Sequence, residues 1–173
     1  MNKYLLIFAL LFLSNSTNAQ EVQWVSFEEA IALNKENPKP ILVDIYTDWC
    51  GWCKKMDKDT YANPVIAAYI NKNYYAVKLD GEGSAPITYK EYTFKLNTER
   101  RPKYHELSAM LMNGKLSYPT TVFMNKKEEL LTRIPGYLNP RKMEMVLTYF
   151  IKEERETKSW GEFSKKFKSK LKE

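Results

Sequence analysis

Only two cysteines and one histidine occur among the 173 residues of this sequence. A structural zinc site uses about four ligands, so two cysteines and the single histidine, His105, argue against one. The two cysteines, Cys50 and Cys53, are three positions apart. A bond between them would close a loop too small to stabilise the fold much by restricting the unfolded chain. Their closeness therefore favours a chemical role over a structural one.

Long apolar runs, internal repeats and low-complexity tracts are also missing. The run from Tyr4 to Leu13 has ten residues, whereas a membrane-spanning helix needs about 20. The formal net charge of +6 is mild, and it gives no reason to expect a nucleic-acid partner. With 44% hydrophobic and 14% aromatic residues, the chain can bury a full core without disulfides. Its length suits one domain.

The N-terminal residues have the pattern of a secretory signal peptide. Lys3 supplies a positive start, the apolar run follows, and Ser14 to Ala19 is small and polar. Thr17-Asn18-Ala19 before Gln20 fits a signal-peptidase site. We therefore expect residues 1–19 to be removed and the protein to be exported to the periplasm. A permanent N-terminal anchor is the alternative, although the apolar run is short for it, and no cysteine directly follows the run to carry a lipid.

The stretch from Ile41 to Lys55 combines a buried strand with the cysteine pair. Its apolar beginning is typical of a strand buried on both faces, and helical periodicity follows from Cys53 to Asp59. A thiol at a helix start is ionised easily, because free N–H groups and the helix dipole favour an anion. We expect Cys50 to be the exposed nucleophile and Cys53, one turn further on, to be the buried resolving thiol.

Asp44 is a carboxylate in the middle of this apolar strand. Burial disfavours its charged form, so we expect its pKa to be raised, which would let it exchange a proton with Cys53. Lys78, on the next predicted strand, should moderate the cost of burial. The alternative is that Asp44 turns to solvent.

Asp44 through Lys54 resembles the active site of the thioredoxin family. The matching features are Trp49 before the first cysteine, Gly51 after it, Lys54 after the second, and an acid six residues before Cys50. Lys78 and the segment Tyr118-Pro119-Thr120-Thr121, which resembles the family's cis-proline loop, extend the match. The segment from Cys53 to Val65 is similar to the C-terminal domain of the transmembrane reductase DsbD and its small relatives.

The resemblance implies an α/β thioredoxin fold, with a central mixed sheet flanked by helices, over residues 20–155. It implies thiol–disulfide oxidoreductase activity on protein substrates, leaning towards reduction, with an unidentified electron donor or acceptor and no cofactor beyond the Cys50–Cys53 disulfide. The implied catalytic residues are Cys50, Cys53, Asp44 and Lys78. The implied substrate-binding residues are Trp49, Gly51, Trp52, Tyr118, Pro119 and Thr120, of which Trp52 replaces the proline of thioredoxin itself.

Residues 81–113 form an insertion before the cis-proline strand. Ile87–Tyr89 and Tyr92–Leu96 alternate in the strand period and predict a hairpin. A helix is expected from Pro102 to Met112, with Leu107, Met110 and Leu111 inward and His105 on the surface. Because the preceding strand ends at the active-site edge, we expect the insertion to shape substrate choice rather than to hold the fold together.

Residues 156–173 predict a basic amphipathic helix. Ser159 and Glu162 form a capping box, and the apolar stripe consists of Trp160, Phe163, Phe167 and Leu171. We expect this stripe to pack on the domain. Contact with a membrane surface or a partner protein is the alternative.

Three other functions are compatible with the sequence. The same fold can serve as a disulfide oxidase or isomerase, because the reduction potential depends on how well the thiolate is stabilised. Two thiolates can also carry Cu(I). Finally, the insertion and the C-terminal segment could make the chain a module that binds partners without catalysis.

Overall fold

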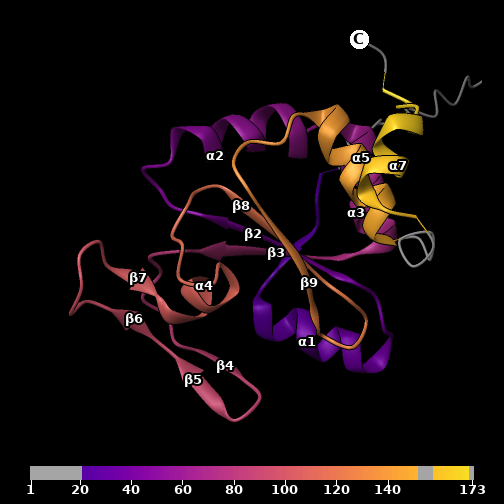
Figure 1. Cartoon of the computed structure of the whole chain (residues 1–173). Helices are drawn as coiled ribbons and strands as arrows, with labels where there is room; N and C mark the ends of the chain where they lie inside the picture. Colours follow the sequence, from indigo (N-terminus) through magenta and orange to yellow (C-terminus); the bar gives the residue numbers. More distant parts are fainter. Residues whose placement is uncertain (1–20, 152–157, 172–173) are drawn as a thin grey trace, which may run out of the picture.

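A five-stranded mixed sheet runs through the middle of the protein (Figure 1). The computed structural model describes residues 21–151 and 158–171. The strand order is β1-β3-β2-β8-β9. β2 (Ile41–Tyr46) is parallel to β3 (Tyr75–Asp80), which is parallel to β1 (Trp24–Val25). β8 (Thr120–Met124) is antiparallel to β2 and to β9 (Leu130–Pro135). The predicted buried strand before the cysteines is confirmed as β2, and Lys78 lies on the neighbouring strand β3, as expected.

Helices cover both faces of the sheet. α1 (Phe27–Glu36) lies on one face, and α2 (Gly51–Met56), α3 (Pro64–Asn73) and α5 (Pro140–Ile151) lie on the other (Figure 1). Local sequence explains where α1 and α3 begin. Ser26 Oγ accepts the Glu29 N–H at 3.1 Å, and Asn63 Oδ1 accepts the N–H groups of the first turn of α3.

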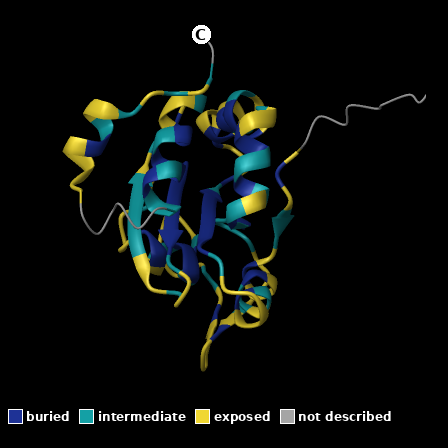
Figure 2. Cartoon of the chain, turned by 90° about the vertical axis from the view of Figure 1, so that its right-hand side faces the viewer, coloured by how far each residue is buried: buried dark blue, intermediate teal, exposed yellow. Residues whose placement is uncertain are grey.

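Two apolar clusters sandwich the sheet because side chains alternate along each strand. Leu42 and Phe123 pack towards α3 and α5, whereas Val43 and Val77 pack towards α1. Figure 2 shows the central strands as buried. All residues of β2 except Tyr46 are buried, so this strand is enclosed on both faces, as predicted.

The helix after the cysteines differs from the expected Cys53 to Asp59. α2 begins at Gly51, and residues Asp57–Tyr61 form a π-helix, η1. Its wider turn is closed by the Ala62 N–H, which donates to the Asp57 carbonyl at 2.9 Å. Single π-helical turns occur frequently at functional sites, and both ends of this one, Asp57 and Tyr61, contact Lys78.

The insertion contains the predicted hairpin, formed by β4 (Ile87–Tyr89) and β5 (Tyr92–Phe94). A second pair, β6 (Leu96–Asn97) and β7 (Tyr104–His105), was not anticipated. The helix expected from Pro102 is α4 (Glu106–Leu111) instead. The Arg101–Pro102 peptide is cis and β7 precedes the helix, so the start at Pro102 was wrong. Leu107 and Leu111 are buried as predicted, but Met110 is exposed.

His105 is buried, and the expectation of a surface position was wrong. Its Nδ1 accepts the Leu107 N–H at 3.2 Å, which caps α4, and its Nε2 lies 3.1 Å from the Ala85 carbonyl oxygen. Its backbone N–H donates to the Gly81 carbonyl at 2.7 Å. His105 therefore ties the end of β7 to the first residues of the insertion.

The hairpin also contributes to the core. Tyr89 and Phe94 belong to the apolar cluster beneath α1, and the Tyr89 ring lies edge-on to Phe27 with centroids 5.2 Å apart. The Thr88 N–H donates to Glu28 Oε1 at 3.1 Å. The expectation that the insertion does not help to hold the fold together is therefore wrong for these two buried side chains.

The C-terminal helix, α7, spans Trp160–Lys166 and is shorter than predicted. Its capping box between Ser159 and Glu162 is confirmed, and Phe163 is buried against Tyr149 with ring centroids 5.1 Å apart. Residues 167–171 continue in non-helical conformation. The proposed signal peptide and residues 152–157 lie outside the described part of the chain. Within the described part, no helix is long and apolar enough to cross a membrane.

Candidate active site

Cys50 and Cys53 form a disulfide at the junction of β2 and α2. Cys50 is the N-cap of α2, and its Sγ accepts the Cys53 N–H at 3.0 Å. The Cys50 N–H donates to the Thr47 carbonyl at 3.1 Å, which closes the turn out of the strand. The strand therefore delivers Cys50 to the positive end of a helix, where a thiolate is stabilised.

Both cysteines are buried in this disulfide form, which corrects the expectation of an exposed Cys50. Cys50 is 4% exposed and Cys53 is 2% exposed, and the Cys50 sulfur lies against the first turn of α2, where it accepts the Cys53 N–H. The neighbouring indoles behave differently, since Trp49 is 65% exposed and Trp52 is 60% exposed. Two large apolar rings therefore flank a sulfur that is itself almost covered.

Asp44 is fully buried in β2, where it lies between Lys78 of β3 and Thr121 of β8 in register. Its Oδ2 accepts from Lys78 Nζ at 2.8 Å, whereas its Oδ1 has no hydrogen-bond partner among the described residues. Burial raises the pKa of Asp44, and the Lys78 charge counters only part of this effect. The predicted burial and the direction of the pKa shift are confirmed, and the solvent-facing alternative was wrong.

Lys78 is shared between two carboxylates, because its ammonium also pairs with Asp57. Desolvation alone would lower the pKa of Lys78, but the two carboxylates together raise it. Three rings surround the Nζ atom with centroids about 5 Å away, and we call them the lysine cage: Trp24 at 4.9 Å, Tyr46 at 5.2 Å and Tyr61 at 5.2 Å.

The cage and Asp57 were missed in the sequence analysis. Asp57 carries a weak signal, since it lies four residues after Cys53 and so on the same side of the helix. Trp24 and Tyr61 come from segments that are distant in sequence and carry no such signal. Tyr61 is buried beside Asp44, and burial followed by the nearby Asp44 charge raises its pKa well above the ordinary value.

The Tyr118–Pro119 peptide is cis, as predicted. The Pro119 carbonyl accepts the Gly136 N–H at 2.7 Å, and the buried Thr120 hydroxyl donates to the Ser117 carbonyl at 2.7 Å. The side chain of Thr120 is therefore engaged inside the protein. The half-buried Tyr118 is different, because within the described chain neither its backbone N–H nor its carbonyl forms a hydrogen bond.

The insertion meets the active site through its first two residues. Glu82 Oε1 accepts the Trp49 indole N–H at 3.1 Å, and the Trp49 ring lies edge-on to Tyr118 with centroids 5.7 Å apart. Gly81 lies so close to Tyr118 that a Cβ there would be 2.4 Å from ring atom Cε1. The predicted exit of the insertion at the active-site edge is confirmed, but Gly81 and Glu82 were missed.

Trp52 contacts a second group on the other side of α2. Its ring centroid is 5.5 Å from that of Tyr137, whose hydroxyl donates to Asp59 Oδ2 at 3.2 Å. Lys55 forms a 2.6 Å salt bridge with the same Asp59 oxygen.

Gly51 has open space around the position of a Cβ, so sterics do not explain a glycine there. In residues 21–151 and 158–171, no group of three or more His, Cys, Asp or Glu side chains could hold a metal ion.

A mixed sheet, a cis-proline strand beside β2, and a Cys-x-x-Cys disulfide at a helix start together define a thioredoxin-fold protein. The sequence model of the thioredoxin-like domain matches residues 27–151, and the chain belongs to this family. The disulfide bond reductase DsbH of Chlamydia pneumoniae is 28% identical over 118 residues, which make up 67% of this chain and 64% of that protein.

Another relative matches over a shorter region. The thiol:disulfide interchange protein DsbD of Vibrio vulnificus is 32% identical over 65 residues, or 34% of this chain, but the match spans only 11% of DsbD. Among solved structures, a thioredoxin-fold protein from Helicobacter pylori has a TM-score of 0.56 at 19% identity, covering 75% of this chain and 80% of that one. A putative disulphide-isomerase from Bacteroides thetaiotaomicron has a TM-score of 0.53 at 23% identity, covering 78% and 97%.

Proposed function

We propose that the protein is a thiol–disulfide oxidoreductase that reduces disulfides in other proteins. The observation that carries this proposal is the Cys50–Cys53 disulfide, with Cys50 as the N-cap of α2. A cysteine at this position has a stabilised thiolate, which is the attacking species in disulfide exchange. The name of the relative DsbH, a disulfide bond reductase, supports the direction of electron flow.

The reaction starts from the dithiol form. The Cys50 thiolate attacks one sulfur of a substrate disulfide, which forms a mixed disulfide and releases the first substrate thiolate. The Cys53 thiolate then attacks Cys50 Sγ, which forms the intramolecular disulfide and releases the second substrate thiolate. Two electrons pass from the protein to the substrate, and the released thiolates take up two protons. An unidentified dithiol donor must then reduce Cys50–Cys53.

Asp44 is proposed as the base for the resolving step. Cys53 is buried, so bulk water does not readily take its proton. Burial raises the pKa of Asp44, and one of its oxygens has no hydrogen-bond partner in the described residues, so its carboxylate is a stronger base than that of an ordinary aspartate and can accept the Cys53 proton. Lys78 is proposed to moderate this pKa, because its ammonium stabilises the ionised carboxylate.

The substrate is proposed to lie along the cis-proline loop as an added strand. The Tyr118 backbone supports this because its hydrogen-bonding groups are unused within the described chain. Trp49, Trp52 and Tyr118 would provide apolar contacts beside Cys50. Gly51 would leave room next to the sulfur, while Pro119 and Thr120 would shape the loop without direct side-chain hydrogen bonds to the substrate.

Export to the periplasm is part of the proposal and rests on the signal-peptide pattern of residues 1–19. The mass of the protein recovered from the periplasm tests this export. We expect that mass to correspond to a chain without its first 19 residues. The dithiol donor that reduces the Cys50–Cys53 disulfide is to be identified by experiment. The chain matches only a small fraction of DsbD, so the activity of that whole protein is not carried over.

A trapping experiment tests the function. The Cys53→Ala variant should accumulate mixed disulfides with exported proteins through Cys50, and these should disappear on adding dithiothreitol. The Cys50→Ala variant is the matched control and should trap nothing. Absence of mixed disulfides with Cys53→Ala would contradict the proposal. A reducing protein should have a reduction potential of about −270 mV, which is typical of thioredoxin. A value of about −180 mV, which is typical of protein disulfide isomerase, would contradict the reducing direction.

A further inference from the structure

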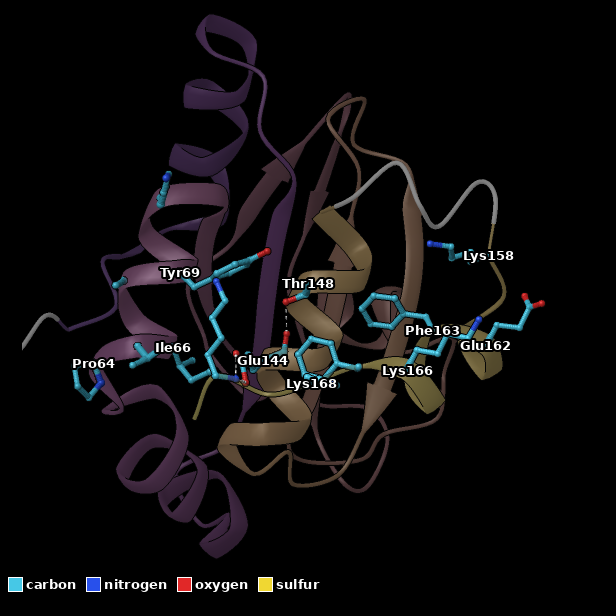
Figure 3. Close-up of a pocket in the computed structure, with 15 residues that line it drawn as sticks. Pro64, Ile66, Tyr69, Glu144, Thr148, Lys158, Glu162, Phe163, Lys166 and Lys168 are labelled. Carbon is cyan, nitrogen blue, oxygen red and sulfur yellow. Dashed lines mark hydrogen bonds between the residues drawn. The ribbon is translucent and has the colours of Figure 1, made fainter. Parts of the chain in front are cut away.

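A groove of about 850 Å³ lies between α3 and the C-terminal segment (Figure 3). It is separate from the active site, because α7 lies at the opposite end of the molecule from the start of α2 (Figure 1). Its apolar lining comes from both walls. The α3 wall contributes Val65, Ile66 and Tyr69, and the wall formed by α7 and the residue after it contributes Phe163 and Phe167.

The α3 wall is unusual for a surface helix. Ala68 and Tyr69 lie three and four residues after Val65, and Lys72 lies three and four residues after them, so the four residues form one stripe along the helix. The outward stripe of a soluble helix is normally polar. Here Val65 is 45% exposed, and Lys72 ends the stripe. Apolar surface therefore remains open to solvent along the floor of the groove.

The rim of the groove is positively charged. Its lining includes the lysines Lys72, Lys158, Lys166, Lys168 and Lys170. Only two carboxylates line it, Glu144 and Glu162, which leaves a net charge of +3. None of Lys72, Lys166, Lys168 and Lys170 forms a salt bridge with a carboxylate of the described chain.

Both carboxylates are already engaged in holding the C-terminal segment. Glu144 accepts the Ser169 hydroxyl and the Lys170 N–H, the latter at 2.9 Å to Oε1. Glu162 Oε2 accepts the Ser159 N–H at 3.0 Å and the Ser159 hydroxyl at 2.8 Å. The Glu144 bonds tie the C-terminal segment to α5, and the Glu162 bonds cap the start of α7, so the groove is built by specific contacts.

We propose that this groove binds an anionic amphiphile with a single acyl chain, such as a fatty-acid anion. The apolar walls would bury the acyl chain, and the rim lysines would hold the anionic head group. The volume lies within the range of small-molecule pockets, about 300–1,000 Å³. Residues 1–20 are a poorer occupant because they contain no acidic residue and carry Lys3, so they would add positive charge to a positive rim.

Titration calorimetry of the full chain with sodium palmitate, kept below its micellar concentration, tests the proposal. One palmitate should bind per chain. Hexadecyltrimethylammonium, with the same chain length and the opposite charge, should not bind measurably. Equal binding of the two probes, or no binding of palmitate, would overturn the proposal.

Two variants probe the two halves of the site. Lys166→Glu/Lys168→Glu removes head-group charge and Val65→Asp places a charge on the apolar wall, and each should weaken palmitate binding by about tenfold or more. These side chains are exposed, so the fold should be retained, which circular dichroism would check. Lys126→Glu/Lys127→Glu, in the exposed turn before β9, is the matched control and should bind as the wild type does.

Other occupants give different results. If anionic phosphatidylglycerol vesicles sediment the protein while monomeric palmitate does not bind, the groove is part of a membrane-binding face and the proposal is wrong. If the Val65→Asp variant converts a dimer into a monomer, the groove is covered by a second copy and the proposal is again wrong. Disulfide reduction by all these variants should equal that of the wild type, so failure of this proposal is distinguishable from failure of the redox function.

Discussion

Asp44 Oδ2 lies 2.8 Å from Lys78 Nζ, yet the pKa of Asp44 is still raised. The main reason is burial, which disfavours the charged carboxylate, and Lys78 offsets only part of this cost, since Asp57 pairs with the same ammonium. Asp44 is fully buried, whereas the Asp57 side chain is 44% exposed. The costly desolvation therefore falls on Asp44, and the compensating charge is divided. This arrangement leaves a buried carboxyl with a raised pKa, which makes it a better proton acceptor than an ordinary aspartate.

Replacing Asp44 by Asn should slow turnover near neutral pH with little change in substrate binding. The amide keeps the shape of the side chain but cannot accept the Cys53 proton. The pH–rate profile should lose one apparent pKa, which belongs to the coupled group of Asp44 and the thiols. Measuring kcat and KM for disulfide reduction across pH checks this. Wild-type turnover from mildly acidic to mildly alkaline pH would leave Asp44 without a catalytic role.

The same variant should change the pH dependence of stability. Below the ordinary carboxyl pKa of 3.8, Asp44 is protonated in both folded and unfolded states, so its ionisation contributes nothing. As pH rises, the Asp44 carboxyl ionises first in the unfolded chain, because its pKa is lower there. The free energy of unfolding then falls until the pH passes the raised pKa of Asp44 in the folded state. The total loss is ~1.4 kcal/mol for each unit by which the two pKa values differ.

Asp44→Asn should therefore be more stable than the wild type at neutral pH, and its advantage should shrink as pH falls through this window. Urea unfolding at a series of pH values, with the disulfide intact in both proteins, measures the difference. A variant less stable than the wild type at neutral pH would mean that the Lys78 pairing outweighs the burial of the charge.

Gly81→Ala should alter substrate binding more than stability. A Cβ at this position would lie 2.4 Å from Cε1 and 2.7 Å from the hydroxyl of Tyr118, so the ring must move. Because Tyr118 is only half-buried, the ring can shift at a cost of about 1–2 kcal/mol. Its contact with Trp49 would change, and KM for protein disulfides should rise.

Gly161→Ala is the control for Gly81→Ala, because a Cβ at Gly161 has open space around it. Kinetics with a folded protein substrate and with a small-molecule disulfide would separate the effects. If Gly81→Ala has the same KM and kcat as the wild type for both substrates, the Tyr118 ring has no part in substrate choice.

Phe94→Ala should destabilise the protein by about 3 kcal/mol, because the buried ring fills the cluster beneath α1. Tyr92→Ala, two residues earlier on the same strand, should cost less than about 1 kcal/mol because Tyr92 is 56% exposed. Denaturant unfolding gives both values. Equal and small losses would show that the hairpin is dispensable for the fold.

Local patterns explain which parts of the structure could be predicted. β2 and the Ser159 cap depend on residues adjacent in sequence, so periodicity and capping rules were sufficient for them. The first residue of α4 could not be predicted from such local patterns. His105 acts as its N-cap, a role that preference lists assign to Ser, Thr, Asp and Asn, and its burial depends on the remote Ala85 and Gly81.

The same distinction applies to the active site. Cys50, Cys53 and Asp44 were predictable because one short segment carries them. The lysine cage was not, because Trp24 comes from the first strand and Tyr61 from a π-helical turn. Such a turn leaves little trace in sequence periodicity. Only the folded chain brings these rings around Lys78.

The pH dependence of alkylation of each thiol tests the central claim most directly. After reduction, iodoacetamide labelling followed by mass-spectrometric mapping gives separate rates for Cys50 and Cys53. We expect Cys50 to react well below the free-cysteine pKa of about 8.5, since it caps α2, and Cys53 to react slowly until higher pH. Equal and slow reaction of the two thiols would contradict the assignment of Cys50 as the nucleophile.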